Sequence, residues 1–515
     1  MPDPVFLAVD LGAESGRVIA GRYSPASPDG DGGTVTLEEV HRFPNGPVSI
    51  PGPDGTPSLR WDLPALWKEI VAGLTLAGTR FSGEVVSVGV DTWGVDHVLL
   101  SESGEALGLP WNYRDARTTN GLEDAFAVVP REEIFAGTGV QFMAINSLYQ
   151  LRATKRDHPE LLEAAKRLAL MPDWFHRCLC GSEAVEFTNA TTTQLVDPTT
   201  RDWNRDLIAK FGLPDELFGP VVQPGTELGT LFPSVARQTG LPESVKIVAP
   251  ATHDTGSAVA AVPTERTGRA DWAYISSGTW SLVGVETQAP VLGEAALAAN
   301  VTNEGGVDGT NRLLKNVMGL WLVQGVRRSF ARGAQYDSGD LDYDELTRRA
   351  EAAEGLTSLI NPDDPRFLAP QDMAAEIVGF CRETGQPEPR DIAAMVRCCL
   401  DSLALRYAAV LESLAELTGE TPQVVHVVGG GSRNSLLNQL TADACGVPVL
   451  AGPVEATALG NVLVQARAAL EIDSLADLRA VVRRSEEVKR FEPNADRRER
   501  WAEAQTRLRA LSARN

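Results

Sequence analysis

The sequence predicts a mixed α/β protein whose two halves open on the same architecture. Residues 5–9 are five apolar residues without alternation, the pattern of a strand buried on both faces. A turn with glycines at 12 and 16 follows, and residues 18–23 have the composition of a second strand. The same order returns at 272–285, with Ser277-Gly278-Thr279 in the turn. This repeat favours two α/β halves, each with a hairpin turn whose backbone N–H groups can approach an anion.

Length and composition limit the classes of protein that remain. With 515 residues the chain exceeds one ordinary core, and its length predicts about two to four domains. The 43% hydrophobic and 23% charged residues are typical of a folded soluble protein. The formal net charge of −22 argues against nucleic acid or an anionic membrane as a partner. No apolar run approaches the ~20 residues that cross a bilayer, and the N-terminus lacks a secretion signal, so we expect a cytoplasmic protein.

The six cysteines are too sparse and too unevenly spaced for a disulfide framework. His176 and Cys178-Leu179-Cys180 invite a metal-site interpretation, but no second pair of ligands follows at the spacing that zinc requires. We therefore expect Cys178 and Cys180 to be buried thiols on a helix.

The rest of the first half continues the α/β pattern. We expect a partly exposed strand at 34–43, a loop rich in Pro and Gly at 44–57, a helix over 63–74 and a buried strand at 85–91. Residues 114–246 carry helices and Pro-rich connections, which we interpret as an insertion on the substrate side.

The second half follows the same plan. After the hairpin, the spacing of apolar residues predicts a helix over 391–417, and a buried strand at 423–428 runs into Gly429-Gly430-Gly431. The tail beyond Asp473 is rich in Arg and Glu, which is typical of surface helices. The predicted domains are 1–246, 247–472 and a helical tail, 473–515, packed on the second domain.

Two hairpins of this kind, one in each half, suggest a nucleotide held between two domains. The sequence contains neither the Gly-x-x-x-x-Gly-Lys-Ser/Thr of P-loop proteins nor the Gly-x-Gly-x-x-Gly of Rossmann domains. Because the chain is acidic overall, an anionic nucleotide needs local positive elements: a metal, an arginine or exposed backbone amides. Asp10, at the end of the first strand, is placed to hold a hydrated Mg²⁺, and Arg17 is placed to reach a phosphate. A solvated structural acid remains the alternative for Asp10.

Several motifs in register resemble the FGGY carbohydrate kinases. Their residues are 10–17, 91–96, 253–255, 276–281, 302–306, 315–322 and 429–431. The matches run in order from residue 5 to about 465, so the resemblance covers nearly the whole chain. It implies two ribonuclease-H-like domains of the actin-like ATPase fold with a cleft between them.

The resemblance also implies a function. FGGY kinases of this pattern transfer the γ-phosphoryl group of ATP to O1 of a ketose, with Mg²⁺, and the whole-chain pattern favours L-rhamnulose in L-rhamnose catabolism. A kinase for another ketose such as L-fuculose, and a non-catalytic actin-like ATP switch, remain alternatives. The expected partners are ATP and the ketose alone, and the protein is expected to be a monomer or a small homo-oligomer.

The sugar side of the site centres on Asp254, our candidate for the catalytic base. A carboxylate near the start of a helix, flanked by His253 and Thr255, can accept the proton of a sugar hydroxyl. A structural alternative is that Asp254 caps this helix. Gly94 would let backbone atoms approach the sugar, or would simply form a turn. The resemblance adds His253, Thr255 and Asn316 to the sugar site.

The ATP side combines one group of residues from each half. The candidates are Ala13, Glu14, Ser15, Gly16, Arg17, Thr279, Gln324 and Gly430; the resemblance alone assigns Gln324. Glu14 stands where related loops carry Ser or Thr, and a carboxylate beside a triphosphate would repel it. We therefore expect the Glu14 side chain to point away from the phosphate or to bind the metal.

Overall fold

The computed structural model describes residues 3–25, 32–52, 54–81, 83–332, 342–469 and 472–512. It contains two compact units. Unit 1 comprises residues 1–268, 287–313 and 456–486, and unit 2 comprises 269–286, 314–455 and 487–515. Within the described ranges, no helix combines the length and hydropathy that crossing a bilayer requires. Each compact unit is assembled from several separate segments of the chain. The domain boundaries expected at residues 246 and 472 therefore stay a prediction.

Unit 1 is built on a six-stranded sheet with the order β13-β14-β6-β1-β2-β3. The strands are β1 (Val5–Leu11), β2 (Ser15–Ser24), β3 (Thr34–Pro44), β6 (Val85–Thr92), β13 (Thr226–Thr230) and β14 (Lys246–Ala249). Every residue of β1 is buried, as its uninterrupted apolar run predicts. The strand pairs antiparallel with β2 and parallel with β6, and β6 pairs parallel with β14.

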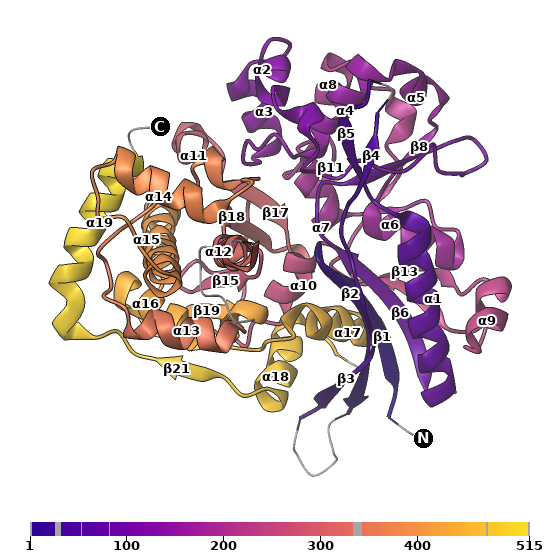
Figure 1. The fold of residues 1–515 in the computed structure, drawn as a ribbon. Coiled ribbons are helices and arrows are strands. Elements are labelled where there is room, and N and C mark those ends of the chain that lie inside the picture. Colours follow the sequence, from indigo (N-terminus) through magenta and orange to yellow (C-terminus); the bar gives the residue numbers. More distant parts are fainter. Residues whose placement is uncertain are drawn as a thin grey trace. The chain divides into compact units, whose positions relative to one another are not determined.

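Helices cover both faces of this sheet (Figure 1). A Cβ on Gly73 of α1 (Leu63–Arg80) would lie 2.4 Å from Val18, and a Cβ on Gly21 would lie 2.4 Å from Val462 of α17 (Ala456–Ala468). Val18 and Gly21 are three residues apart on β2 and therefore point to opposite faces. The sheet is thus buried between α1 and α17.

The predicted loop at 44–57 is wrong in part. It contains β4 (Val48–Pro51), which pairs antiparallel with β5 (Pro57–Arg60). All four residues of β4 are exposed, and the strand is a short Val-Ser-Ile-Pro segment among Pro and Gly residues, whose loop signal outweighs it.

The insertion at 114–246 holds the predicted helices. They are α2 (Gly121–Phe126), α3 (Arg131–Thr138), α4 (Ser147–Asp157), α5 (Pro159–Ala164), α6 (Met171–Cys180), α7 (Phe187–Ala190), α8 (Arg205–Lys210) and α9 (Pro233–Thr239). Short strands pair as β7 (His97–Leu100) with β8 (Arg167–Leu170), β9 (Val185–Glu186) with β12 (Val221–Val222), and β10 (Val196–Asp197) with β11 (Asp202–Trp203).

Cys178 and Cys180 lie on α6 as free, partly buried thiols. Burial raises the pKa of Cys178 to about 12, so this sulfur stays protonated near neutral pH. Among the described residues, no group of three or more His, Cys, Asp and Glu side chains is arranged to hold a metal ion. Both cysteines lie on a helix as expected, but they are partly buried and not fully buried as predicted.

Unit 2 is built on a second sheet of seven strands in the order β17-β18-β16-β15-β19-β20-β21, of which β17 (Thr302–Gly305) belongs to unit 1. The other strands are β15 (Ala273–Ser277), β16 (Trp280–Thr287), β18 (Asn311–Met318), β19 (Val425–Val428), β20 (Val449–Ala451) and β21 (Lys489–Phe491), and the division between the units falls within β18. Strands β15 and β16 form the predicted second hairpin, and β15 pairs parallel with β19.

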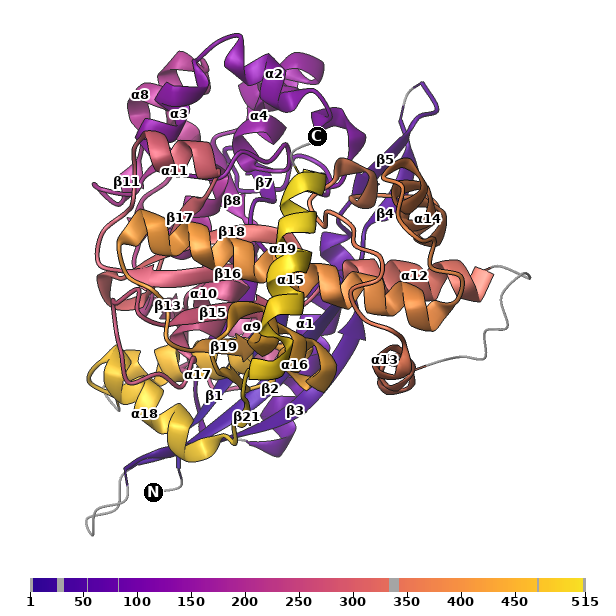
Figure 2. The same ribbon diagram turned by 90° about the vertical axis from the view of Figure 1, so that its left-hand side faces the viewer.

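One long helix, α15 (Ile392–Thr418), forms the core of the helical layer of unit 2 (Figure 2). It packs against α12 (Trp321–Arg332), α13 (Tyr343–Ala352), α16 (Ser435–Cys445) and α19 (Arg498–Ser512), and α14 (Met373–Glu383) packs on α12. Its bounds agree closely with the helix expected over 391–417. In the predicted tail, α18 (Leu475–Ser485) belongs to unit 1 and α19 to unit 2.

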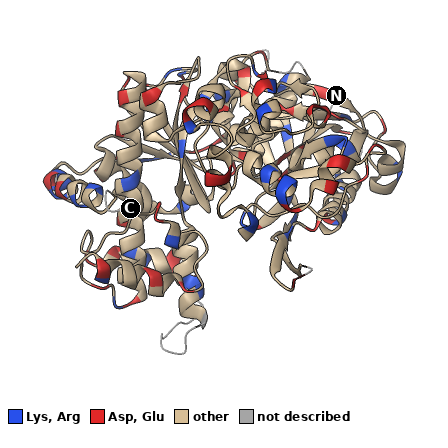
Figure 3. Ribbon diagram, turned by 90° about the horizontal axis from the view of Figure 1, so that it is seen from above, with Lys and Arg blue, Asp and Glu red and all other residues tan. Residues whose placement is uncertain are grey.

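Acidic and basic residues are interspersed along the ribbon (Figure 3). The 69 Asp and Glu residues outnumber the 47 Lys and Arg residues. The positive charge that an anionic substrate needs must therefore come from particular side chains and backbone N–H groups near the site.

Candidate active site

The carboxyl ends of the parallel strands of unit 1 bring the predicted sugar-side residues to one edge of the sheet. Asp10 lies opposite Asp91 in the register of β1 and β6. The loop after β14 pairs with the end of β6, because the Thr92 N–H donates to the Thr252 carbonyl at 2.9 Å. Open α/β sheets bind ligands at this edge.

Asp254 is the first residue of the helix α10 (Asp254–Ala260), and His253 occupies the N-cap position. Asp254 Oδ1 accepts hydrogen bonds from the Thr255 backbone N–H at 2.5 Å and from the Thr255 hydroxyl at 3.1 Å. The carboxylate therefore does contact the helix start, yet its side chain remains 32% exposed. Capping and base chemistry are compatible here.

The pKa of Asp254 lies above its ordinary value. Burial is the main cause and the negative charge of Asp10 adds to it, while His253 acts in the opposite direction. A raised pKa makes a carboxylate a better proton acceptor, and general bases commonly have such values.

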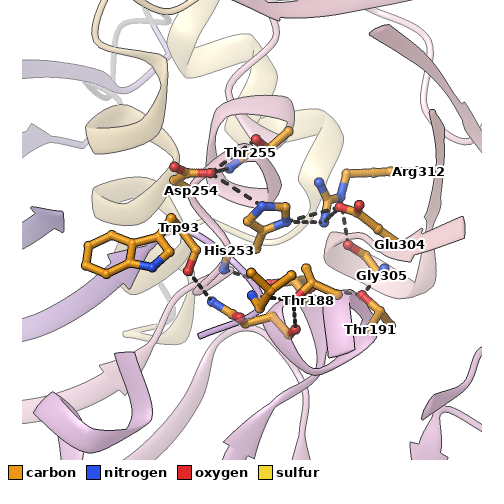
Figure 4. A network of polar contacts seen from close by, with 12 residues as sticks. Trp93, Thr188, Thr191, His253, Asp254, Thr255, Glu304, Gly305 and Arg312 are labelled. Carbon is orange, nitrogen blue, oxygen red and sulfur yellow. Dashed lines mark hydrogen bonds and ion pairs between the residues drawn. The ribbon is translucent and has the colours of Figure 1, made fainter. Parts of the chain in front are cut away.

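A buried carboxylate, Glu186, organises the loop before the helix α10. One oxygen accepts the Thr252 N–H at 2.9 Å, the Thr252 hydroxyl at 2.7 Å and the Thr188 hydroxyl at 2.5 Å. The Thr188 hydroxyl in turn accepts the His253 N–H at 3.2 Å (Figure 4). Glu186 was not among the predicted site residues, and the run of Thr and Asn residues after it is its one local signal in the sequence.

Gly94 is required by close packing. A Cβ there would lie 2.9 Å from the methyl group of Thr192. Thr192 cannot easily move aside, since its hydroxyl donates to the Asn189 carbonyl at 2.7 Å and accepts the Val95 N–H at 2.9 Å. Val95 has φ of 69°, a strained value for a β-branched residue and one that clusters at functional sites. The turn interpretation of Gly94 thus holds, and its role toward the sugar stays a prediction.

Trp93 is buried and its ring stacks on Trp61 with 4.1 Å between centroids. Both indole N–H groups donate to one oxygen of Asp96, at 3.0 Å from Trp93 and 2.6 Å from Trp61. Gln150 donates to the other oxygen at 2.8 Å. Burial raises the pKa of Asp96 to about 6. This network fixes the segment on which Gly94 lies.

The first hairpin places Asp10 and Arg17 together. The Arg17 guanidinium lies 2.5 Å from an Asp10 oxygen, and Asp10 is 6% exposed. Gly16 is dictated by packing, because a Cβ there would lie 2.3 Å from the Phe43 ring. Arg17 is thus held at the turn where a phosphate contact was predicted.

The turn itself contains Ala13 and Glu14. The Gly12 N–H donates to the Ser15 carbonyl at 2.9 Å, and the Glu14 carbonyl accepts the Asn45 N–H at 3.0 Å. The Glu14 residue is exposed. Phosphate binding by these residues stays a prediction.

The carboxylates at this edge affect one another. Asp91 is fully buried, and burial together with Asp10 and Asp254 raises its pKa well above the ordinary value. A nearby cation would relieve this repulsion, and carboxylate oxygens suit Mg²⁺, which keeps several waters. The residues therefore fit a magnesium ion held partly through water rather than one enclosed by protein ligands.

In unit 2, Thr279 lies in the turn between β15 and β16. The Gly278 N–H donates to the Trp280 carbonyl at 2.9 Å, and the Thr279 carbonyl accepts N–H groups from Gly319 and Trp321 at 3.2 and 3.1 Å. These bonds bring the start of α12 to the turn. Gln324 lies one turn into that helix, and its N–H donates to the Leu320 carbonyl at 2.9 Å.

The glycines after β19 lie beside the same hairpin. A Cβ on Gly431 would lie 2.0 Å from the Ser277 hydroxyl, and Gly429 has φ of 81°. Gly430, by contrast, faces open space, with nothing within 4 Å of a Cβ. This openness is what a flat adenine ring would need. Asn316 lies half-buried on β18 of unit 2.

Comparison with known proteins agrees with this arrangement. Residues 47–261 match the N-terminal domain of the FGGY family of carbohydrate kinases, and residues 273–469 match its C-terminal domain. The chain belongs to the FGGY family of carbohydrate kinases, and the predicted actin-like two-domain α/β fold is confirmed.

The chain is also similar to a named sugar kinase along nearly its whole length. The rhamnulokinase of Bacteroides thetaiotaomicron is 46% identical over 490 residues, which are 95% of this chain and 96% of the relative. Among solved structures, the xylulose kinase of Lactobacillus acidophilus has a TM-score of 0.78 at 16% identity and covers 99% of this chain and 97% of its own. Plasmodium falciparum glycerol kinase with ADP has a TM-score of 0.74 at 15% identity, covering 99% and 98%. These structures show the fold.

Proposed function

We propose that this sugar kinase phosphorylates L-rhamnulose at O1, consuming ATP and producing L-rhamnulose 1-phosphate and ADP. The observation that carries the proposal is the 46% identity to a rhamnulokinase along 95% of the chain. The expected setting is L-rhamnose catabolism in the cytoplasm.

Asp254 acts as the general base. It accepts the proton of the O1 hydroxyl while that oxygen bonds to the γ-phosphorus of ATP and ADP departs. Its partial exposure and its raised pKa support this role. His253, Thr255, Gly94 and Asn316 would bind and orient the ketose.

ATP would be held by residues from both sequence halves. In the first half, the backbone amides of 13–16 and the Arg17 side chain would contact phosphate. In the second, Thr279 would contact phosphate, and Gln324 and Gly430 the rest of the nucleotide. Asp10 would hold Mg²⁺ through water, and the ion would supply positive charge that neutralises the phosphates.

The test is a coupled ADP-release assay with L-rhamnulose, L-fuculose, L-ribulose, D-xylulose and glycerol. We expect L-rhamnulose to give the highest kcat/KM. A higher value for another ketose would overturn the substrate assignment, and no turnover with any of them would favour a non-catalytic ATP switch.

The base is tested with Asp254→Asn, which cannot accept a proton. We expect kcat to fall about 10²- to 10⁴-fold, with ATP affinity by calorimetry changed less than about twofold. Turnover near that of the unaltered enzyme would remove Asp254 from this role.

A further inference from the structure

The side chain of His253 has charged neighbours on its far side from Asp254 (Figure 4). Glu304, on β17 (Thr302–Gly305), places an oxygen 3.1 Å from His253 Nδ1. Arg312, at the start of β18, places Nη2 3.1 Å from the same oxygen and 3.3 Å from His253 Nδ1. Glu304 is 4% exposed and Arg312 is 0% exposed. Burial of two charges that touch a site residue is costly unless they are paired, as they are here.

The ion pair is anchored to the backbone. Arg312 Nε donates to the Gly305 carbonyl at 2.8 Å, and the Gly305 N–H donates to the Thr191 hydroxyl at 3.0 Å. Although burial works to raise it, the charges of Arg312 and His253 hold the pKa of Glu304 below its ordinary value. Glu304 is therefore a carboxylate at neutral pH.

These contacts decide which nitrogen of His253 bears a proton. Of the two neighbours of Nδ1, Arg312 makes a hydrogen bond with it, whereas the Glu304 oxygen at 3.1 Å accepts no hydrogen bond from the described residues. A guanidinium has donors only, so in the neutral imidazole Nδ1 accepts from Arg312 and the proton resides on Nε2. When the imidazole is cationic, Nδ1–H faces Glu304 and Nε2 again bears a proton. Nε2 lies 3.5 Å from Asp254 Oδ1. Both states thus direct an N–H group toward Asp254.

One oxygen of Asp254 is accordingly engaged and the other is not. Within the part of the chain that the structure describes, every hydrogen bond and ion pair of Asp254 ends on Oδ1: those from the Thr255 N–H, the Thr255 hydroxyl and His253 Nε2. Two hydrogen bonds and one ion pair thus hold Oδ1 in place. Oδ2 is left as the oxygen that can accept a proton.

We propose that Glu304 and Arg312 are positioning residues, which hold the His253 imidazole with its Nε2–H on Asp254 Oδ1 and so present Oδ2 to the sugar hydroxyl. The inference rests on the proposed role of Asp254 as the base. Neither Glu304 nor Arg312 needs to touch the sugar or ATP for this effect, because both act through His253.

The first test is a double-mutant cycle in kcat. Glu304→Gln keeps the size of the side chain and removes its charge. We expect kcat to fall by up to about 100-fold, because misplacing a reacting group has a cost of this size. The KM for ATP should change less than about twofold. In a His253→Gln background, the same change should lower kcat less than about twofold further. Equal losses in both backgrounds would overturn the proposal.

Arg312→Lys is a second variant should Glu304→Gln fold poorly. Lysine keeps the positive charge but cannot contact both Glu304 and the Gly305 carbonyl, so we expect an intermediate loss of kcat. The matched control is Asp401→Asn, which breaks the buried ion pair between Asp401 and Arg397 (2.9 Å) on α15. This control should lower Tm and leave kcat of the folded enzyme unchanged. An equal fall in kcat for the control would show that any lost buried ion pair suffices and would overturn the proposal.

The second test reads the tautomer in the unaltered protein. The chain has six histidines, so ¹⁵N-histidine labelling gives a short set of ring signals, and His253→Gln identifies the one that belongs to His253. We expect a protonated Nε2, and a bare Nε2 with a protonated Nδ1 would contradict the proposal. The tests distinguish failure of the proposed base from failure of the proposed positioning. Turnover by Asp254→Asn refutes the role of Asp254 as the base. An inactive Asp254→Asn together with an additive double-mutant cycle refutes only the positioning role of Glu304 and Arg312.

Discussion

His176 offers a pH prediction whose size follows from the structure. It lies on α6, is 0% exposed, and its Nε2 accepts the Val90 backbone N–H at 3.0 Å. Burial lowers the pKa of His176 from 6.5 to about 3. The imidazole must therefore stay neutral in the folded protein, where it holds the end of β6 next to Asp91.

The sign of the effect follows from this lowered pKa. Between pH 6.5 and pH 3 the unfolded chain binds a proton at this position and the folded chain does not, so acidification favours unfolding. The contribution is fully present above pH 6.5 and is lost as the pH falls. At pH 5 the loss amounts to about 2 kcal/mol of unfolding free energy, since each pH unit below 6.5 costs about 1.4 kcal/mol.

The perturbation is His176→Gln, which can keep an acceptor for the Val90 N–H but cannot titrate. We expect the fall in unfolding free energy between pH 7.5 and pH 5 to be about 2 kcal/mol smaller in the variant, measured by urea unfolding with tryptophan fluorescence. Parallel pH curves for the unaltered protein and His176→Gln would refute the reasoning.

Two glycine predictions concern packing. Gly94→Ala should destabilise the protein by about 1–3 kcal/mol and raise the KM for the ketose, because its Cβ meets Thr192 at 2.9 Å. Adding Thr192→Ser, which removes the nearest methyl group, should restore part of the stability in thermal unfolding and part of the KM in kinetic assays. If neither is restored, the contact with Thr192 is not the cause. Gly460→Ala on α17 should lower Tm strongly, because its Cβ would lie 1.9 Å from the Ser257 carbonyl oxygen of α10. Gly379→Ala on α14, where the nearest atom lies 3.9 Å away, should raise Tm slightly through helix propensity. Equal changes in Tm for Gly460→Ala and Gly379→Ala would show that packing around the glycine does not determine the effect.

The elements that sequence patterns predicted share a local cause. Strand β1 and helix α15 bury continuous or periodic apolar residues, so the sequence of each contains its own signal. The exposed strand β4 is only four residues long and lies among Pro and Gly residues, so its pattern indicated a loop and the strand was missed. The pair β4 and β5 forms because the chain folds back on itself, which single-strand patterns cannot report.

The residues of the candidate site also differ in whether local sequence patterns reveal them. Asp254 and Gly94 stand in short motifs that could be read directly, together with their neighbours. Glu304 stands in the 302–306 motif, but its role was not predicted, and Glu186 and Arg312 stand in no such motif. Each of the three acts on a partner about 50 to 70 residues away in the chain: Glu186 on Thr252, Glu304 and Arg312 on His253.

Local apolar runs and residue types were enough to predict the fold class and the two hairpins, and to single out candidate site residues. Only the tertiary structure decided how those residues are held: that Gly94 is closed in by Thr192, and that Asp254 is engaged through one oxygen. The physical reason is that hydrogen bonds and ion pairs depend on distances of about 3 Å, which arise only once remote strands lie side by side.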